Sequence, residues 1–110
     1  MIAKKYRVPR EKIAFILRKG EERASEFFII RLSANVESFS RFRTIVSRKM
    51  DRSAVKRNSL RRKIYEAIRL NVKENDTRTG KDIILIPKKK ILNKSFLAIK
   101  KDIKKTIWTN

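Results

Sequence analysis

A change of hydrophobic period within residues 42–69 constrains the fold of this chain more than any other feature. Residues 42–47 alternate between two sides of the backbone, which is typical of a β-strand. Farther along, Leu60, Ile64 and Ile68 recur every three to four positions, which indicates a helix with one apolar side. Such a strand followed by such a helix predicts a sheet with a helix packed on it.

The same predicted helix has a second side, which is cationic. At 100° per residue, the polar and aromatic residues beside the apolar stripe spread over an arc of about 140°: Arg57, Asn58, Arg61, Arg62, Tyr65 and Arg69. Between Arg41 and Lys63 the chain has ten Lys or Arg residues and one acid, Asp51. We therefore expect a folded body that presents a basic helix to a polyanion.

The net charge favours a nucleic-acid partner over an ordinary charged surface. The chain has 31 basic and 11 acidic residues in 110 positions, a net charge of +20. A net charge with a magnitude of about 2 to 8 is enough to keep a small domain soluble. A larger uncompensated charge of one sign opposes the compact state. The length suits a single RNA-binding domain spanning residues 1–110.

Several function classes are excluded by what the sequence lacks. It has no cysteine or histidine and only two glycines, which excludes disulfides, zinc sites, imidazole catalysis and Gly-rich phosphate loops. The acids are scattered, whereas metal-dependent hydrolysis needs carboxylates that converge. We therefore predict no catalytic residue, metal ligand or small-molecule cofactor in this chain. With no apolar run of about 18 residues, we expect no membrane contact. We also expect a cytoplasmic location, with which the absence of cysteine is compatible.

Six elements are predicted in the order α-β-β-α-β-α, with room for one extra short strand. After an extended basic arm at 1–8 come a helix from Pro9 to Gly20, strands at 26–32 and 41–47, the basic helix from Ser53 to about 70–73, a polar loop at 74–81, a strand at 82–86, and a helix capped by Asn93 or Ser95. We expect strands 26–32 and 41–47 to pair as a hairpin, and Gly20 to cap its helix in the left-handed conformation. The order predicts one small α+β domain with a central sheet.

One ordered block of residues resembles a known family, the bacterial ribonuclease P protein component. That family's signature is a strand ending in Val-Ser-Lys-Lys, then a helix built on Arg-Asn-Arg followed by Lys-Arg. It is similar to residues 45–49, IVSRK, and 54–62, AVKRNSLRR. The resemblance covers nearly the whole chain, although Ser59 replaces the third residue of Arg-Asn-Arg and Tyr65 replaces a later arginine.

The resemblance implies a protein cofactor of a ribozyme. In the family, the ribonuclease P RNA together with Mg²⁺ removes the 5′ leader of precursor tRNA. The protein binds that RNA through the basic helix and holds the leader in a cleft between the first helix and the sheet. The resemblance also implies a left-handed βαβ crossover, similar to that of a ribosomal-protein domain.

RNA contact is predicted for eleven residues of the strand, the turn and the basic helix. They are Arg43, Ser47, Arg48, Lys49, Arg52, Lys56, Arg57, Asn58, Arg61, Arg62 and Tyr65. Arginine can hold a phosphate with two hydrogen bonds, asparagine can add another, and a tyrosine ring can pack on a sugar or base. Lys88–Lys90 and the C-terminal lysines are expected to add general electrostatic attraction.

The leader cleft implied by the resemblance is assigned to four apolar residues, Ile13, Leu17, Phe27 and Ile30. Ile13 and Leu17 stand at positions that are aromatic in the family. Aliphatic side chains cannot reproduce base stacking, which contributes about 1–3 kcal/mol per base.

Two other functions fit the charge. The chain could be a ribosomal or ribosome-associated RNA-binding protein with no role in tRNA processing, or a general chromosome-binding protein that prefers duplex DNA. Neither requires the ordered block at 45–62.

Overall fold

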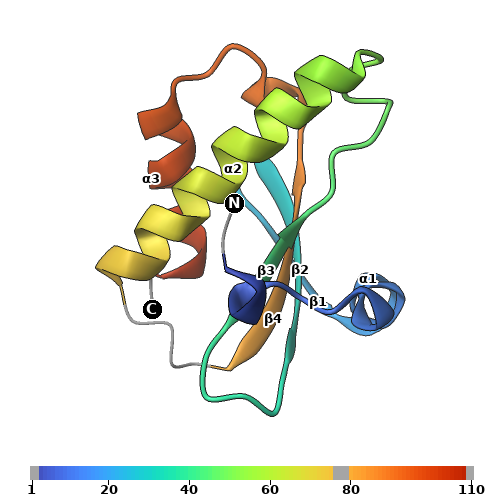
Figure 1. The fold of residues 1–110 in the computed structure, drawn as a ribbon, viewed down its shortest axis with the longest axis vertical. Coiled ribbons are helices and arrows are strands. Elements are labelled where there is room, and N and C mark those ends of the chain that lie inside the picture. The colour runs from blue at the N-terminus through green and yellow to red at the C-terminus, as the bar shows by residue number, and fades with distance from the viewer. Residues whose placement is uncertain (1–2, 76–79, 109–110) are drawn as a thin grey trace.

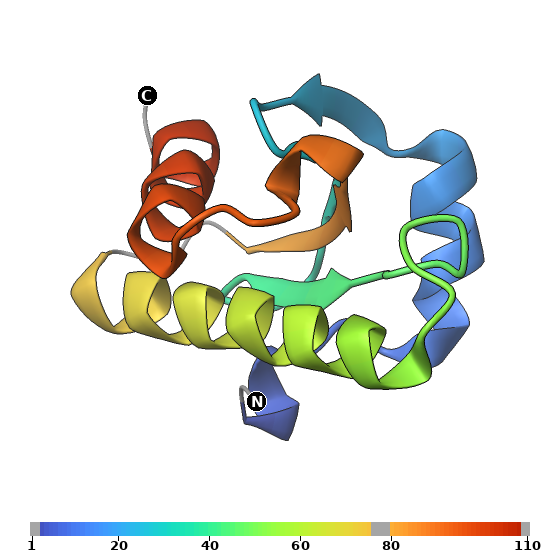
Figure 2. The same cartoon turned by 90° about the horizontal axis from the view of Figure 1, so that it is seen from above.

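The computed structural model describes residues 3–75 and 80–108, which form a sheet with helices on both faces (Figure 1). Helices α2 and α3 cover one face and α1 lies on the other (Figure 2). The elements are η1 (Lys4–Tyr6), η2 (Arg10–Lys12), α1 (Ile13–Lys19), β1 (Glu21–Ala24), β2 (Phe28–Ala34), β3 (Arg41–Thr44), α2 (Ala54–Glu74), β4 (Lys81–Pro87), η3 (Lys89–Ile91) and α3 (Phe96–Ile107). The predicted α+β class is confirmed, and β1 is the extra short strand.

The strand order corrects the predicted hairpin. The sheet runs β1-β2-β4-β3, so β4 separates the two strands that were expected to pair. β4 is antiparallel to β2 and parallel to β3. Its residues 83–85 are buried on both faces, which favours the centre of a sheet. β3 has arginines on one of its faces, at Arg41 and Arg43, and therefore takes an edge.

Because β3 and β4 are parallel neighbours, the chain must cross over between them, and α2 makes that crossover. In Figure 2 the path runs from β3 outward, along α2 and back to β4 with a left-handed sense, as the resemblance implied. The crossover lays α2 across the sheet with its first turns beyond the end of β3 (Figure 1).

Two apolar clusters hold the layers together. The larger lies between the sheet and the α2–α3 pair and includes Phe28, Phe42, Ile64 and Ile103, all fully buried. The smaller lies under α1 and contains Val8, Ile16 and Ile84. Burial of this kind stabilises a fold by about 25 cal/mol for each Å² of apolar surface removed from water.

The N-caps of α2 and α3 are residues that the sequence analysis named as candidates. The Ser53 hydroxyl accepts a hydrogen bond from the Lys56 N–H at 3.2 Å, and the Ser95 hydroxyl accepts one from the Ala98 N–H at 3.1 Å. Ser95, rather than Asn93, is therefore the cap of α3. Helix α2 continues to Glu74 instead of ending at 70–73. Part of the predicted polar loop, at 76–79, lies outside the described residues.

The prediction of an extended N-terminal arm is wrong for residues 3–8. Residues 4–6 form the turn η1, and Arg7 then pairs with Phe42 at the edge of β3. The Val8 N–H donates to the Phe42 carbonyl at 3.1 Å. The arm is held because Val8 fills the small cluster under α1.

Gly20 is not left-handed: its φ is −67° and its ψ is 159°, so that prediction is wrong. Glycine is required there by close packing. A Cβ at this position would lie 2.5 Å from the Ile16 carbonyl oxygen and 2.9 Å from the Leu32 carbonyl oxygen. The missing side chain lets the end of α1 approach β2.

We expect Gly20→Ala to lower the free energy of unfolding by about 1–3 kcal/mol, because backbone atoms of α1 and β2 would have to move apart. Denaturant unfolding measures the change. Lys19→Ala, an exposed neighbour, is the control and should stay within about 0.5 kcal/mol of the wild type. Equal stability of the Gly20→Ala and wild-type proteins would contradict this close approach.

Candidate nucleic-acid interface

One side of α2 changes from apolar to cationic along its length. Arg57, Arg61, Ile64 and Ile68 follow one another at helical spacing on the same side of the helix. Ile64 and Ile68 are fully buried, whereas Arg57 and Arg61 are only partly so. The change occurs where the helix passes beyond β3 (Figure 1). The stripe that packs in the core thus continues outward as a row of arginines.

Arg57 fixes the loop between β3 and α2. Its Nη1 donates to the carbonyls of Asp51 and Arg52, at 2.9 and 3.0 Å. A guanidinium has five N–H groups in a fixed fork, and those on Nε and Nη2 have no partner among the described residues. Arg57 is therefore held in place and still has donors free for another partner.

The other polar side chains at this end of α2 lie exposed or partly exposed beside Arg57. Asn58 accepts a hydrogen bond from Arg61, and Lys56 and Arg62 are exposed. In the described part of the chain, none of these cations pairs with a carboxylate. Farther along α2, Arg69 does pair with Glu66, and this hydrogen bond lowers the pKa of Glu66. The start of α2 is thus an uncompensated cationic surface.

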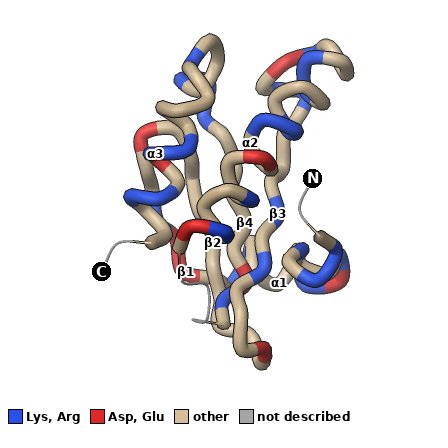
Figure 3. The backbone as a smooth tube through the Cα atoms, turned by 60° about the vertical axis from the view of Figure 1, so that its left-hand side comes forward, with Lys and Arg blue, Asp and Glu red and all other residues tan. Residues whose placement is uncertain are grey.

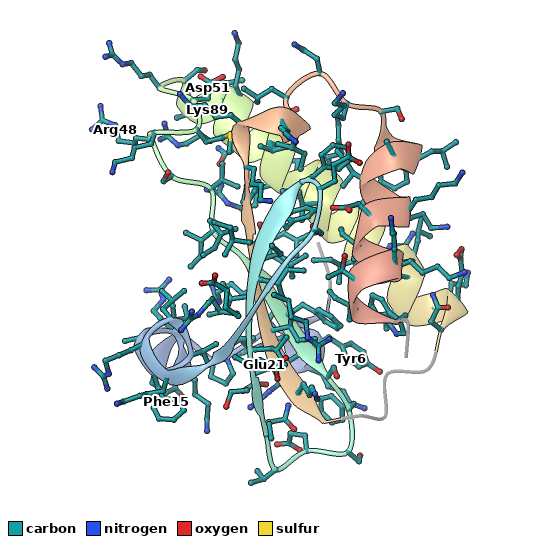
Figure 4. All side chains as sticks on the ribbon, turned by 180° about the vertical axis from the view of Figure 1, so that it is seen from behind. Tyr6, Phe15, Glu21, Arg48, Asp51 and Lys89 are labelled. Atoms are coloured by element: carbon teal, nitrogen blue, oxygen red, sulfur yellow. The ribbon has the colours of Figure 1, made fainter. Side chains whose placement is uncertain are left out.

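The loop before α2 and the turn η3 extend that surface. Arg48, Lys49 and Arg52 line a hollow of about 700 Å³ together with Lys89 of η3. Figure 4 shows Arg48, Asp51 and Lys89 at the same end of the molecule. Another hollow, of about 390 Å³, is lined by Lys56, Arg57, Lys63 and Asn93, among others. Ser47 is exposed beside this loop.

Asp51 does not neutralise these cations by direct pairing. Its Oδ1 accepts the Ser53 N–H at 2.9 Å, so it shapes the turn into α2. Sequence reasoning treated Lys88–Lys90 as general surface and missed the place of Lys89 beside Arg48. No local signal in the sequence joins residues 41 positions apart.

Tyr65 does not lie on the cationic face, and that prediction is wrong. Its side chain is 4 % exposed, and its hydroxyl accepts the Thr44 N–H at 3.2 Å. Tyr65 belongs to the fourth turn of α2, which already lies over the sheet. The phenol hydroxyl therefore binds the backbone of the last residue of β3 and is not available to an RNA.

Arg43 also lies away from the predicted patch. Its Nε and Nη2 donate to the Val8 carbonyl at 3.1 and 2.9 Å, which holds the N-terminal segment on the sheet. Arg43 lines a separate hollow of about 530 Å³, whose cationic lining also includes Lys4, Lys5, Arg7, Arg10 and Arg41. This third cationic hollow was not foreseen, because it forms only when residues 4–10 fold back onto β3.

In this hollow, the Arg41 guanidinium is neutralised by a buried carboxylate, whereas the Arg7 guanidinium is not. Arg41 donates two hydrogen bonds to the buried Asp82, at 2.7 and 2.9 Å, and these raise the pKa of Arg41. The Nε of Arg7 is buried without a hydrogen-bond partner. The hollow therefore keeps the capacity to attract an anion.

The apolar residues assigned to the cleft separate onto two faces. Phe27 and Ile30 are 4 % and 0 % exposed in the cluster under α2 and α3, away from α1, so their assignment to a cleft beside α1 is wrong. Ile13 and Leu17 lie on α1, and Leu17 is 37 % exposed.

Ile29, which sequence reasoning missed, belongs to the face that α1 covers. It is 38 % exposed and pairs in register with Ile86 of β4. Ile45 and Ile86 pack beside the cluster under α1. A partly open aliphatic strip therefore runs beside α1. The period of two could have identified it, since Ile29 and Ile30 must face opposite ways.

The described ranges contain no group of three or more acidic side chains placed to hold a metal ion. Nor does any helix in those ranges have the length and apolarity to cross a membrane. The arrangement offers cations, aliphatic surface and hydrogen-bond donors, which suit phosphates and sugars.

Comparisons with known proteins agree on one family. The family model described as Ribonuclease P matches residues 3–109. The chain is 33% identical over 92 residues to the ribonuclease P protein component of Clostridioides difficile (strain 630), covering 84% of this chain and 79% of that protein. It is also 33% identical over 82 residues to that of Thermotoga sp. (strain RQ2), covering 74% and 68%.

Solved structures give the same result. The RNase P protein from Thermotoga maritima matches with a TM-score of 0.78 and 27% identity, over 90% of this chain and 92% of that chain. The RNase P protein of Staphylococcus aureus matches with a TM-score of 0.72 and 28% identity, over 94% and 93%. The fold is therefore that of this family.

Replacing Arg57 and Arg61 by Ala should reduce the salt dependence of binding to a folded RNA. Each phosphate contact contributes about −0.7 to −0.9 to the slope of log K against log salt, so the slope should flatten by about 1–2 units. Filter binding across a salt series measures it.

Arg69→Ala is the matched control, since Arg69 lies on the same helix and is paired with Glu66. Its slope should equal that of the wild type. An unchanged slope in the Arg57 and Arg61 variant would exclude both residues from the interface.

Proposed function

This chain belongs to the ribonuclease P protein family, and from that premise we propose that it binds ribonuclease P RNA and the 5′ leader of precursor tRNA. Members of the family are part of an endoribonuclease complex. In the proposed role, the protein promotes the hydrolysis that forms the 5′ end of mature tRNA in the cytoplasm. The RNA subunit with Mg²⁺ supplies the chemistry, and this chain supplies binding and orientation.

The start of α2 is the observation that carries the proposal. Arg57, Arg61 and Arg62 remain unpaired with acids there, and Arg57 is held rigidly by two backbone carbonyls. A rigid guanidinium gives directed contacts to phosphates at a low entropic cost. Structured RNA offers phosphates at fixed spacing, so a preorganised row of cations suits it better than a mobile tail would.

The aliphatic strip beside α1 is the proposed place of the leader. Ile13, Leu17 and Ile29 offer contact to an extended strand without the stacking that aromatic rings give. The cations of the loop before α2 would then hold the strand's phosphates. The leader is thus bound with little preference for base identity, because phosphates and sugars carry no sequence information.

A ribosomal or ribosome-associated role is the second candidate, as the same cationic surface would bind ribosomal RNA. The ordered block at 45–62 and the family match over residues 3–109 favour ribonuclease P. Sequencing the RNA that co-purifies with the protein separates the two roles.

Leader removal by the cognate RNA should depend on this protein at low Mg²⁺. The protein's charge replaces part of the counterion screening that Mg²⁺ gives the RNA. We expect cleavage of precursor tRNA at low Mg²⁺ only when the protein is present, measured by the release of the 5′ fragment. Failure of the protein to restore cleavage would rule out the proposed role.

Leu17→Phe should strengthen binding of leader-bearing tRNA. A ring on the partly exposed side of α1 can stack on one base, an effect of about 1–3 kcal/mol, or roughly 5- to 150-fold in affinity. Affinities for precursor and mature tRNA are compared, and only the precursor should bind more tightly. Lys12→Phe, also on the N-terminal helical segment but outside the strip, is the control. A gain for both tRNAs would argue against a leader cleft beside α1.

A further inference from the structure

Phe15 is the most exposed aromatic side chain among the described residues, at 52 %. The partly exposed rings elsewhere are already in contact with other groups. Tyr6 and Phe39 meet edge to face, and the Lys5 ammonium lies 5.4 and 4.7 Å from their ring centroids. In the described part of the chain, neither a ring nor a cation lies over Phe15. The faces of this ring are therefore free to stack on another group.

Phe15 lies on the side of α1 that faces away from the aliphatic strip. Helix α1 packs on the sheet through the buried Ile16. At 100° per residue, Phe15 lies about 160° around the helix from both Ile13 and Leu17, which belong to the strip. Figure 4 shows Phe15 on the side of α1 that faces away from Arg48 and Lys89. The ring is thus separate from the strip and from the cations at the start of α2.

The outer surface of α1 connects the strip to the ring. Ala14 and Arg18 each lie about 160° around the helix from Ile16, and both are exposed. A helix with its side chains is about 10–12 Å wide. A strand that leaves the strip therefore passes a small side chain and a guanidinium before it reaches Phe15.

The charge around Phe15 favours a polyanion. Residues 10–19 contain four basic residues and one acid, Glu11 (Figure 3). Arg18 and Lys19 are three and four positions after Phe15, so they are its neighbours on the helix surface. Both are exposed, and neither pairs with a carboxylate among the described residues.

The acids that follow α1 have partners of their own. Glu21 accepts a hydrogen bond from Arg23 at 2.9 Å, and Glu22 accepts one from Arg31 at 3.0 Å. Glu11 lines the third cationic hollow, which also contains several cations. The cations beside Phe15 are therefore available to phosphates.

Exposure alone does not distinguish Phe15. Val36 and Leu97 are more exposed, and single exposed apolar side chains are common on protein surfaces. An aliphatic side chain cannot stack on a base, however. Surfaces that bind unpaired RNA combine aromatic rings with cations that follow the backbone, and Phe15 with Arg18 and Lys19 has that combination.

We propose that Phe15 stacks on a base of the 5′ leader where the leader leaves the aliphatic strip and crosses α1. Arg18 and Lys19 hold the neighbouring phosphates. The inference rests on the proposed function, because it takes the leader as the bound strand, and it adds a contact on the opposite side of α1. A leader suits this site because its unpaired bases can be splayed out and stacked on a ring.

The test measures the affinities of the full-length protein for precursor and mature tRNA. Phe15→Leu keeps an apolar side chain but removes the ring, whereas Phe15→Tyr keeps the ring. Leu97→Ala is the control, since it changes an exposed apolar side chain on α3. A second precursor has a leader of abasic nucleotides, which retains the phosphates and lacks the bases. Thermal unfolding verifies the fold of each variant.

We expect Phe15→Leu to weaken binding of the precursor by about 5-fold or more, from the loss of one stacked base. Its affinity for mature tRNA should be unchanged. Phe15→Tyr and Leu97→Ala should bind the precursor as the wild type does. On the abasic leader, the wild type and Phe15→Leu should bind equally, because neither can stack.

Two results would overturn the proposal and leave the proposed function intact. The first is an unchanged precursor affinity of Phe15→Leu, with a wild type that still prefers precursor to mature tRNA. The second is an equal loss for both tRNAs, which would place the ring on the body of the tRNA. Equal wild-type affinities for precursor and mature tRNA would instead overturn leader binding itself, so the two failures are distinguishable.

Discussion

The structure depends on a helix that is longer than the strand beside it. Helix α2 has 21 residues, about 32 Å at 1.5 Å per residue, and β3 has four, about 13 Å. Where α2 lies over the sheet, its inner side must be apolar. Where it extends beyond, the same side has no core to meet and can carry arginines. One side of α2 therefore packs in the core where it lies over the sheet and is available for binding where it extends beyond.

The crossover from β3 to β4 fixes where that stripe ends. Parallel neighbours cannot be joined by a tight turn, so the chain must leave the sheet at the end of β3 and return along α2. The loop that leaves is cationic and is held by Arg57. The turn η3 follows β4 at the same end of the sheet and adds Lys89. The loop with the start of α2 and the turn η3, which are distant in sequence, therefore meet at one end of the sheet because of strand order.

Two acids of this protein, Asp82 and Asp102, are buried and serve as internal anchors. Asp82 holds Arg41 and Asn35, and Asp102 holds the turn before β2. Buried carboxylates need such donors, since an unpaired buried charge is costly. With these acids directed inward, the outer surface is left with most of the cations. The large positive charge is thus displayed to the solvent and to polyanions.

Local features could be predicted because local physics sets them. The caps Ser53 and Ser95, the helical period of α2 and the apolar run of β4 depend on residues close in sequence. The position of β4 between β2 and β3, the burial of Tyr65 and the meeting of Lys89 with Arg48 depend on long-range packing. By itself, the sequence determined the elements and an unneutralised basic helix. Only the tertiary structure decided which cations face solvent together, because that depends on which surfaces the core covers.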